Sequence, residues 1–435
     1  MAKTLVKNLL LGLVAAGILA AMCAMAWQSR LNVHPDELDH VNAGRYFIQY
    51  WDFPAMDDPR LSNTFSNYGV SYLQQLDVVY FFAGKFAAAT APLLGPDYIA
   101  LRFFNIFLFA ILMALCFRLP DDKKIAFLPL FITPQVWYVF SYFNGDAFPM
   151  FLSFCMVYVV ARLDPPVIPS PLGRDSRQSR RLLALGVLLG FICISKQNYY
   201  VLAGFTLAFF GVCGLAARNL KAAAQNAALV FLVVVTLFGA RWGYNTYVNR
   251  TVRPEVPTQN AEKYATPDYK PSAQEAGTQY WGLRMRDQGL TYPQLFSIWT
   301  WHIWSFRTSF GVYDYMKIYA PLLYYRYIGY AFWTLAGALA LALVIHGGPG
   351  GTSALLVFLA FAGLTIFQST WHSWVNDFQA QGRYLFPIGA MAGMTLARFA
   401  KAANRTLPVT GVLAAVMLAL SAYSFLWVGL PLIPK

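Results

Sequence analysis

Long apolar stretches separated by short polar segments recur along the whole chain. About eleven of them approach the roughly 20 residues that a helix needs to cross the hydrocarbon core of a bilayer. They lie at about 5–27, 98–118, 125–143, 147–163, 182–196, 199–217, 222–247, 320–345, 353–370, 384–400 and 409–430. A further apolar run, about 76–94, contains Lys85 and Pro92, which is more typical of an interfacial helix. The pattern predicts an all-α polytopic membrane protein in which residues 1–435 form a single membrane domain.

The composition agrees with this pattern. Of the 435 residues, 58% are hydrophobic and 12% are charged, against about 45–50% and about 25% in soluble domains. A soluble domain of this size cannot bury so much apolar surface, which excludes a soluble enzyme, a disordered chain and a disulfide-stapled scaffold. The five cysteines all lie in apolar runs and indicate neither a disulfide framework nor a paired-cysteine metal motif.

The net charge of +13 is explained by basic residues in the expected loops between the spans. In a membrane protein, Lys and Arg collect in cytoplasmic loops, so the excess is not a sign of nucleic-acid binding. Basic residues precede the expected span one and follow spans two, four, six and ten: Lys3, Lys7, Lys123, Lys124, Arg174, Arg177, Arg180, Arg181, Arg218, Lys221, Arg398, Lys401 and Arg405. This alternation predicts a cytoplasmic N-terminus and an outer C-terminus. We expect the first span to be an uncleaved anchor rather than a signal peptide, because its apolar region is too long.

This orientation leaves two long segments on the outer face, about 28–97 and about 248–318. Loops of this length are usually functional or disordered, and their aromatic content argues against disorder. We therefore expect any chemistry on the outer face. The Trp residues of the second segment are typical either of an aromatic belt at the membrane surface or of a platform for a sugar ring.

The first outer segment opens with His34-Pro35-Asp36-Glu37-Leu38-Asp39-His40. The following apolar spacing predicts an amphipathic helix on the membrane surface, with Asp36 and His40 on one face. The plain alternative is a solvated helix start, in which acidic residues compensate the helix dipole. The position directly after the first span favours a functional role.

At this point the sequence resembles the GT-C superfamily of membrane glycosyltransferases, which use polyprenyl-phosphate sugars and carry an acidic pair in the first outer loop. The resemblance extends to three further motifs, Ala100-Leu101-Arg102-Phe103-Phe104-Asn105, Asn144-Gly145-Asp146 and Gln381-Gly382-Arg383-Tyr384-Leu385-Phe386-Pro387. The Pro-Asp-Glu and Gly-Arg-Tyr-x-x-Pro elements are similar to a bacterial branch of this superfamily. The resemblance implies a multi-pass protein of the bacterial inner membrane with its active site on the outer face. One departure is that Arg45 lies eight residues beyond the acidic pair, whereas several members place a cation closer.

The chemistry of such a transfer assigns expected roles. A carboxylate deprotonates the acceptor hydroxyl, and cations stabilise the leaving phosphate. We expect Asp36 to be the general base, Glu37 to position the acceptor or the base, and Asp146 to assist. Candidate phosphate ligands are Lys196, Arg383, Arg241 and Arg326, for which the alternative is snorkelling to lipid headgroups. Expected substrate contacts are His40, Arg102, Tyr384 and Tyr313.

No cofactor is expected. A polyprenyl-phosphate sugar is already activated, and the sequence contains no Gly-rich nucleotide fingerprint on a strand–helix unit. A catalytic metal held by His34, His40, His302 or His372 with the neighbouring carboxylates is a weaker alternative, since no characteristic ligand spacing is present.

The sequence therefore predicts a glycosyltransferase that moves a hexose or pentose from a polyprenyl-phosphate donor to an envelope glycan or lipid. The main alternative is a transporter or lipid-linked-sugar flippase, which would be expected to show broken helices at the bilayer midplane and repeated halves. A non-catalytic subunit of an envelope-assembly complex, or a polysaccharide polymerase or ligase, are further alternatives. The sugar, the acceptor and the anomeric outcome are left open.

Overall fold

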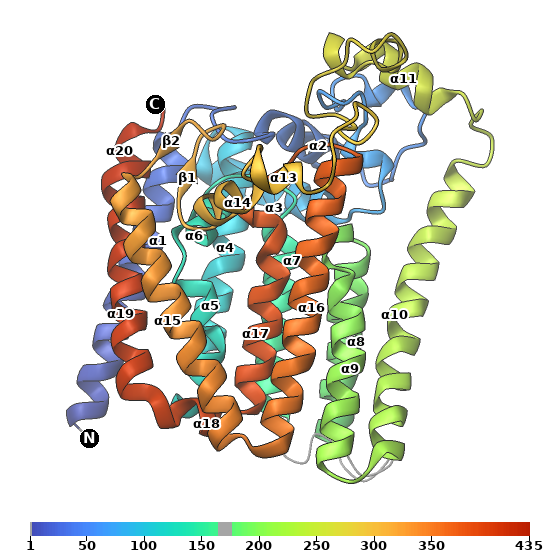
Figure 1. Cartoon of the computed structure of the whole chain (residues 1–435). Coiled ribbons are helices and arrows are strands. Elements are labelled where there is room, and N and C mark those ends of the chain that lie inside the picture. Colours follow the sequence, from blue (N-terminus) through green and yellow to red (C-terminus); the bar gives the residue numbers. More distant parts are fainter. Residues whose placement is uncertain (1, 164–175) are drawn as a thin grey trace.

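The computed structural model describes residues 2–163 and 176–435, and within them the chain is almost entirely helical. Roughly parallel helices form a bundle, and the segments between them are gathered mainly at one end (Figure 1). The prediction of an all-α polytopic membrane protein is confirmed. Seven helices in the described part are long and apolar enough to cross a membrane, and two shorter apolar helices accompany them.

The eleven expected stretches all coincide with helical segments. The long ones are α1 (Ala2–Gln28), α4 (Asp97–Phe117), α9 (Val201–Ala216), α10 (Leu220–Val248), α15 (Leu322–His346), α16 (Gly348–Val375) and α19 (Leu407–Tyr423). The others are shorter or more polar: α5 (Leu128–Phe131), α6 (Pro134–Ser141), α7 (Ala147–Arg162), α8 (Ser176–Cys193) and α17 (Phe386–Arg398). Two of the short helices follow α17 and α19, namely α18 (Ala400–Ala403) and α20 (Leu430–Leu432).

One expected span is broken. Residues 125–143 fold into a 3₁₀ segment and the short helices α5 and α6, because Pro134 cannot continue a preceding helix. Thr133 restarts the chain as α6, with its side-chain oxygen accepting a hydrogen bond from the Gln135 backbone N–H. The expected basic connection at 164–181, including Arg174, lies largely outside the described residues.

The two long segments that were expected on one side of the membrane do lie at the same end of the bundle (Figure 1). The first contains α2 (Glu37–Gln49) and α3 (Val79–Leu94); the second contains α11 (Val256–Tyr264), α12 (Pro271–Glu275), α13 (Gln294–Ser297), α14 (Trp301–Ser309) and the hairpin β1 (Val312–Tyr313) and β2 (Ile318–Tyr319). We call this the loop end. α1 begins near the opposite end and the chain finishes at the loop end.

The expectation of a membrane-surface helix after the first span needs a correction. α2 buries His40, Val41, Tyr46 and Phe47 and packs against α3 and α4. It therefore closes the top of the bundle rather than lying on the lipid. Of the apolar positions that predicted this helix, Val41 and Phe47 are buried against protein, whereas Trp51, just beyond α2, is 72% exposed.

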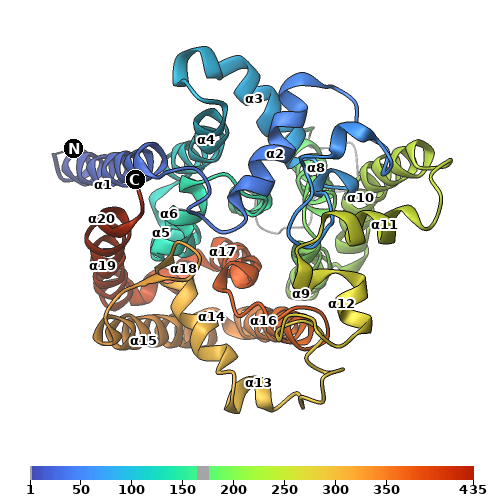
Figure 2. The ribbon, with the colours of Figure 1, turned by 90° about the horizontal axis from the view of Figure 1, so that it is seen from above.

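Seen from the loop end, α17 lies near the centre and the other helices surround it (Figure 2). α10 lies at the periphery and leans away from its neighbours towards the loop end, where it meets α11 (Figure 1). Its side chains there are largely exposed, with Trp242 at 57% and Tyr247 at 61%. The space between this part of α10 and the bundle is where the candidate site is found.

Candidate active site

A cavity of about 640 Å³ lies near the loop end of the bundle. Its walls come from the segment before α3, the turn between α8 and α9, the upper part of α10 and the upper part of α16. Polar and aromatic side chains supply most of this lining, although the helices around it are apolar. A polar hollow in an apolar bundle is the arrangement expected of a binding site rather than of a packing defect.

Asp36 is placed at this end by an unusual backbone. It directly precedes α2 and adopts the left-handed conformation, with φ 59° and ψ 11°. Such a conformation is costly for a residue with a Cβ, by about 1–2 kcal/mol, and strained residues gather at functional sites. The side chain does not cap the helix. Instead, its Oδ2 accepts a hydrogen bond of 3.0 Å from Arg383.

Asp146 is held between two cations. The Lys196 ammonium is 2.5 Å from its Oδ1, and an Arg383 nitrogen is 3.7 Å from its Oδ2. Burial works to raise the pKa of Asp146, but the charges of Lys196 and Arg383 outweigh it and hold the pKa below its ordinary value. Asp146 is therefore an ionised carboxylate.

The local sequence explains how Asp146 and its partners reach this place. Between α6 and α7, Asn144 accepts hydrogen bonds from the backbone N–H groups of Asp146 and Ala147, at 2.8 and 3.1 Å. This turn sets Asp146 at the start of α7, where a negative charge is favoured. Lys196 enters from the 3₁₀ turn Gln197–Tyr199, and Arg383 from the 3₁₀ turn Gly382–Leu385. We call Asp36, Asp146, Lys196 and Arg383 the charged cluster.

His40 and Tyr384 join the charged cluster to the cavity, and both line its wall. His40 bonds the Tyr80 hydroxyl through Nδ1 at 2.7 Å and stacks on Tyr72 with ring centroids 4.4 Å apart. Burial lowers the pKa of His40 to about 3, so the ring is neutral. The Tyr384 hydroxyl lies 3.4 Å from Arg383. These two predicted substrate contacts are therefore brought together.

Arg241 lies beside the cavity, on α10. One of its terminal nitrogens donates to the Gln75 carbonyl at 3.1 Å, and the guanidinium stands over the Phe53 ring at 4.1 Å. Its Nε and second terminal nitrogen have no hydrogen-bond partner within the described residues. Its neighbour Trp242 lines the cavity. Arg241 is thus a buried cation with free donors near the site.

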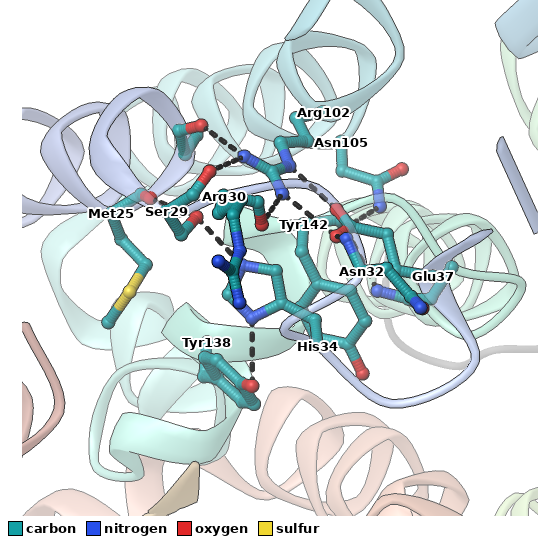
Figure 3. A network of polar contacts seen from close by, with 12 residues as sticks. Met25, Ser29, Arg30, Asn32, His34, Glu37, Arg102, Asn105, Tyr138 and Tyr142 are labelled. Carbon is teal, nitrogen blue, oxygen red and sulfur yellow. Dashed lines mark hydrogen bonds and ion pairs between the residues drawn. The ribbon is translucent and has the colours of Figure 1, made fainter. Parts of the chain in front are cut away.

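The structure places Glu37 and Arg102 elsewhere. Both side chains are fully buried and form a two-pronged ion pair, with distances of 2.6 and 2.8 Å (Figure 3). Arg102 also donates to the backbone carbonyls of Ala26 and Ser29, both at 2.7 Å. The carboxylate oxygens of Glu37 and the guanidinium nitrogens of Arg102 all have hydrogen-bond partners within the protein. The pair fixes the end of α1 to α4, and it leaves no free group for a substrate.

Two other predicted residues lie apart from the cavity. The Tyr313 side chain is buried and bonds the Ser424 hydroxyl at 2.9 Å. Arg326 is exposed on α15. Neither residue lines the cavity, and no contact of either with the charged cluster is found among the described residues, so we leave both out of the proposed site. The described residues contain no group of three or more His, Cys, Asp or Glu side chains that could hold a metal ion.

Asp77 is a cavity residue that the sequence analysis missed. It is 7% exposed, and its Oδ1 accepts a hydrogen bond of 2.9 Å from the Val79 backbone N–H at the start of α3. Burial raises the pKa of Asp77 to about 8, so this carboxyl is mostly protonated at neutral pH. The available signal was an acidic residue two positions before an apolar helix. That pattern is usually read as a cap and carries no functional information.

The fold and the site define a class: an all-α polytopic membrane protein with a charged cluster and a polar cavity at one end of the bundle. Two solved structures of ArnT from Cupriavidus metallidurans are similar to it. The structure bound to undecaprenyl phosphate matches with 14% identity and a TM-score of 0.49, over 94% of this chain and 64% of that one. The apo structure matches with 13% identity and a TM-score of 0.40, over 92% and 78%.

The chain thus spans less than two thirds of the length of the first of these structures. No family model matches the sequence, and no curated protein matches it. The likeness to ArnT is one of fold alone, at values too low to carry a functional argument. The function has to be argued from this chain's own residues.

Proposed function

We propose that the protein is a membrane glycosyltransferase that moves a sugar from a polyprenyl-phosphate donor to a hydroxyl of an envelope glycan or lipid. The observation that carries the proposal is the charged cluster, which sets two carboxylates and two cations next to a polar cavity. Transfer from a lipid phosphate needs this combination: a proton acceptor for the attacking hydroxyl and positive charge for the leaving phosphate.

The proposed step has a simple balance. The acceptor oxygen forms a bond to the anomeric carbon while the bond from that carbon to the phosphate oxygen breaks. The electron pair of the broken bond leaves with the polyprenyl phosphate. The proton of the acceptor hydroxyl passes to the Asp36 carboxylate, and later to water. Lys196, Arg383 and Arg241 hold the phosphate, and Asp146 holds Lys196 in place.

The location of the site favours an acceptor on the outer face of a bacterial inner membrane. The loop end carries both long segments, whereas the basic residues Lys123, Lys124 and Lys401 belong to connections at the other end. Since basic loops stay in the cytoplasm, the loop end faces outwards under this proposal.

The test uses the purified full chain in lipid nanodiscs. We expect it to bind undecaprenyl phosphate, and we expect Lys196→Gln to weaken this binding by about tenfold or more. The control is Lys263→Gln, which changes an exposed lysine of α11 and should bind normally. A wild-type protein that does not bind undecaprenyl phosphate would overturn the proposal.

The second readout separates transfer from transport. With a sugar-loaded donor and membrane acceptors, a transferase releases free undecaprenyl phosphate and forms a new glycoside. A flippase moves the intact donor between leaflets and leaves its sugar bond unbroken. Translocation without release of the sugar would favour the transporter alternative.

A further inference from the structure

The cavity lining is unusually rich in side-chain amides. Seven of its residues are asparagine or glutamine, and they come from the segment before α3, the turn before α9, helices α10 and α16, and the segment after α16. Each amide offers two donors and an acceptor with two lone pairs. Four tyrosines and Trp242 also belong to the lining. Planar polar groups interleaved with aromatic rings suit a ligand that has many hydroxyls and apolar ring faces.

One of these amides is left without partners. Asn198 lies in the 3₁₀ turn between α8 and α9, two residues after Lys196, and lines the cavity. Both its Oδ1 and its Nδ2 are buried and have no hydrogen-bond partner among the described residues. Buried polar atoms are normally bonded, and leaving each one unpaired costs about 1–3 kcal/mol. Asn198 therefore carries one donor group and one acceptor without a protein partner at the wall of the cavity, two residues along the chain from Lys196.

Of the residues that the structure describes, only two with acidic or basic side chains apart from histidine line the cavity, Lys196 and Asp77. Lys196 is paired with Asp146. Asp77 is the one carboxyl of the lining, and no ion pair to it is found among the described residues. Its raised pKa keeps it protonated at neutral pH. The lining thus has one carboxyl and one paired cation against seven amides, and it suits an uncharged sugar better than a charged one.

From these observations we infer that the amide-lined cavity holds the sugar of the donor, that this sugar is an uncharged hexose or pentose, and that Asn198 is a specificity-determining residue bonding its hydroxyls. This inference rests on the proposed function and narrows it to one class of sugar. The sugar lies among the amides and the phosphate lies at the Lys196 end.

The experiment compares five ligands on the full chain in nanodiscs: undecaprenyl phosphate alone, and the same lipid carrying mannose, galactose, glucosamine with a free amine, or glucuronic acid. We expect at least one neutral hexose to bind more tightly than the bare lipid. We expect glucosamine and glucuronic acid to bind no more tightly than the bare lipid. Tighter binding of either charged sugar than of both neutral ones would overturn the inference.

The variant Asn198→Leu keeps the size of the side chain and removes both polar atoms. We expect the preferred neutral donor to bind about tenfold more weakly, and the bare lipid to bind as in the wild type. Because the amide has no protein partner, the thermal midpoint should stay the same or rise. Asn63→Leu, at an exposed position of the first outer segment, is the matched control and should change neither affinity.

The outcomes separate the inference from the proposed function. If the wild type fails to bind the bare lipid, the proposed function fails. If the wild type binds the bare lipid but Asn198→Leu binds the neutral donor normally, only the assignment of the sugar site is overturned. Should Asn198→Leu lower the affinity for bare and sugar-loaded lipid equally, Asn198 belongs to the phosphate site and the inference is again overturned.

Discussion

Arg383 donates a hydrogen bond of 3.0 Å to the Asp36 carboxylate, although 347 positions separate the two residues in the sequence. This contact joins the first long segment to the turn before α17, the helix near the centre of the bundle. Two short motifs that carry little information separately therefore meet in one site. The contact also orients the Asp36 carboxylate. The adjacent Glu37 is paired with a different cation, Arg102.

The first prediction concerns Asp36. Because a general base contributes about 10²–10⁴-fold to the rate, Asp36→Asn should lose most of its transfer activity. Asn tolerates the left-handed backbone at this position, so the protein should fold normally. The measurement is product formed per folded protein, with the thermal midpoint as the folding control. Near-normal transfer by Asp36→Asn would remove Asp36 from the role of proton acceptor.

The second prediction concerns Glu37, for which we expect a defect of stability. Removing one partner of a buried ion pair costs about 3–5 kcal/mol, because the other charge remains buried and unpaired. Glu37→Gln should therefore lower the thermal midpoint in detergent and the yield of folded protein. Glu255→Gln, at an exposed position in the second long segment, is the control and should unfold like the wild type. A stable but inactive Glu37→Gln would restore Glu37 to the catalytic site.

The third prediction concerns pH. The pKa of Asp77 is about 8 in the folded protein, against an ordinary value of 3.8, so protonation favours the folded state. The stability contributed by this group is complete below pH 4 and declines as the pH rises to about 8. Asp77→Asn lacks this decline, so its stability relative to the wild type should increase with pH, by about 1 kcal/mol per unit, and level off above pH 8. The measurement is the thermal midpoint of both proteins between pH 5 and pH 9, with the exposed Asp268→Asn as control. A difference that does not vary with pH would contradict the prediction.

The fourth prediction separates two arginines that the sequence treats alike. Arg241 has buried donors without partners, whereas Arg326 is exposed on α15. Arg241→Gln should weaken binding of undecaprenyl phosphate by about tenfold or more, since hydrogen bonds to charged groups contribute about 1.5–3 kcal/mol. Arg326→Gln should bind it normally. Equal affinities of the two variants would place the phosphate away from α10.

The fifth prediction concerns orientation. Ser62 is exposed in the first long segment, and Thr406 is half-buried in the turn that joins α18 to α19. In a background without the native cysteines, Ser62→Cys should react with an impermeant thiol reagent in intact spheroplasts. Thr406→Cys should react only after the membrane is opened. The reverse pattern would place the charged cluster on the cytoplasmic face.

The helices were predictable because the apolar pattern is long and repeated. The break within 125–143 also had a visible cause, since Pro134 interrupts the pattern. The packing of α2 was not predictable: an apolar face such as that of Val41 and Phe47 fits lipid as well as protein, and the sequence does not say which one covers it. The outcome depends on α3 and α4, which are distant in the chain.

The charged residues illustrate a similar limit. Asp36 was chosen as part of an acidic pair directly after the first span, and Asp146 from a motif of the resemblance. Lys196 and Arg383 were chosen as cations at outer helix ends, and the structure brings all four residues together. The same criterion also selected Arg102 and Arg326, which lie elsewhere. A charge in an apolar segment has to be paired, but its sequence neighbours do not show whether the partner is structural or belongs to a site. Asp77 was missed because its sequence pattern is that of an ordinary cap.

The two anions and two cations of the charged cluster cancel one another in the ligand-free protein. Under the proposed function, the phosphodiester of the incoming donor carries one negative charge and competes with the carboxylates for the two cations. Where it takes over Arg383, Asp36 loses its cation. A carboxylate freed in this way is a stronger base than one held in an ion pair. Binding of the lipid donor thus frees the Asp36 carboxylate to accept the proton of the acceptor hydroxyl. Without the donor, Asp36 stays in its ion pair with Arg383. Under the proposed function, we therefore expect the donor to bind first and the acceptor second, and the Asp36–Arg383 ion pair to re-form when the spent lipid phosphate leaves.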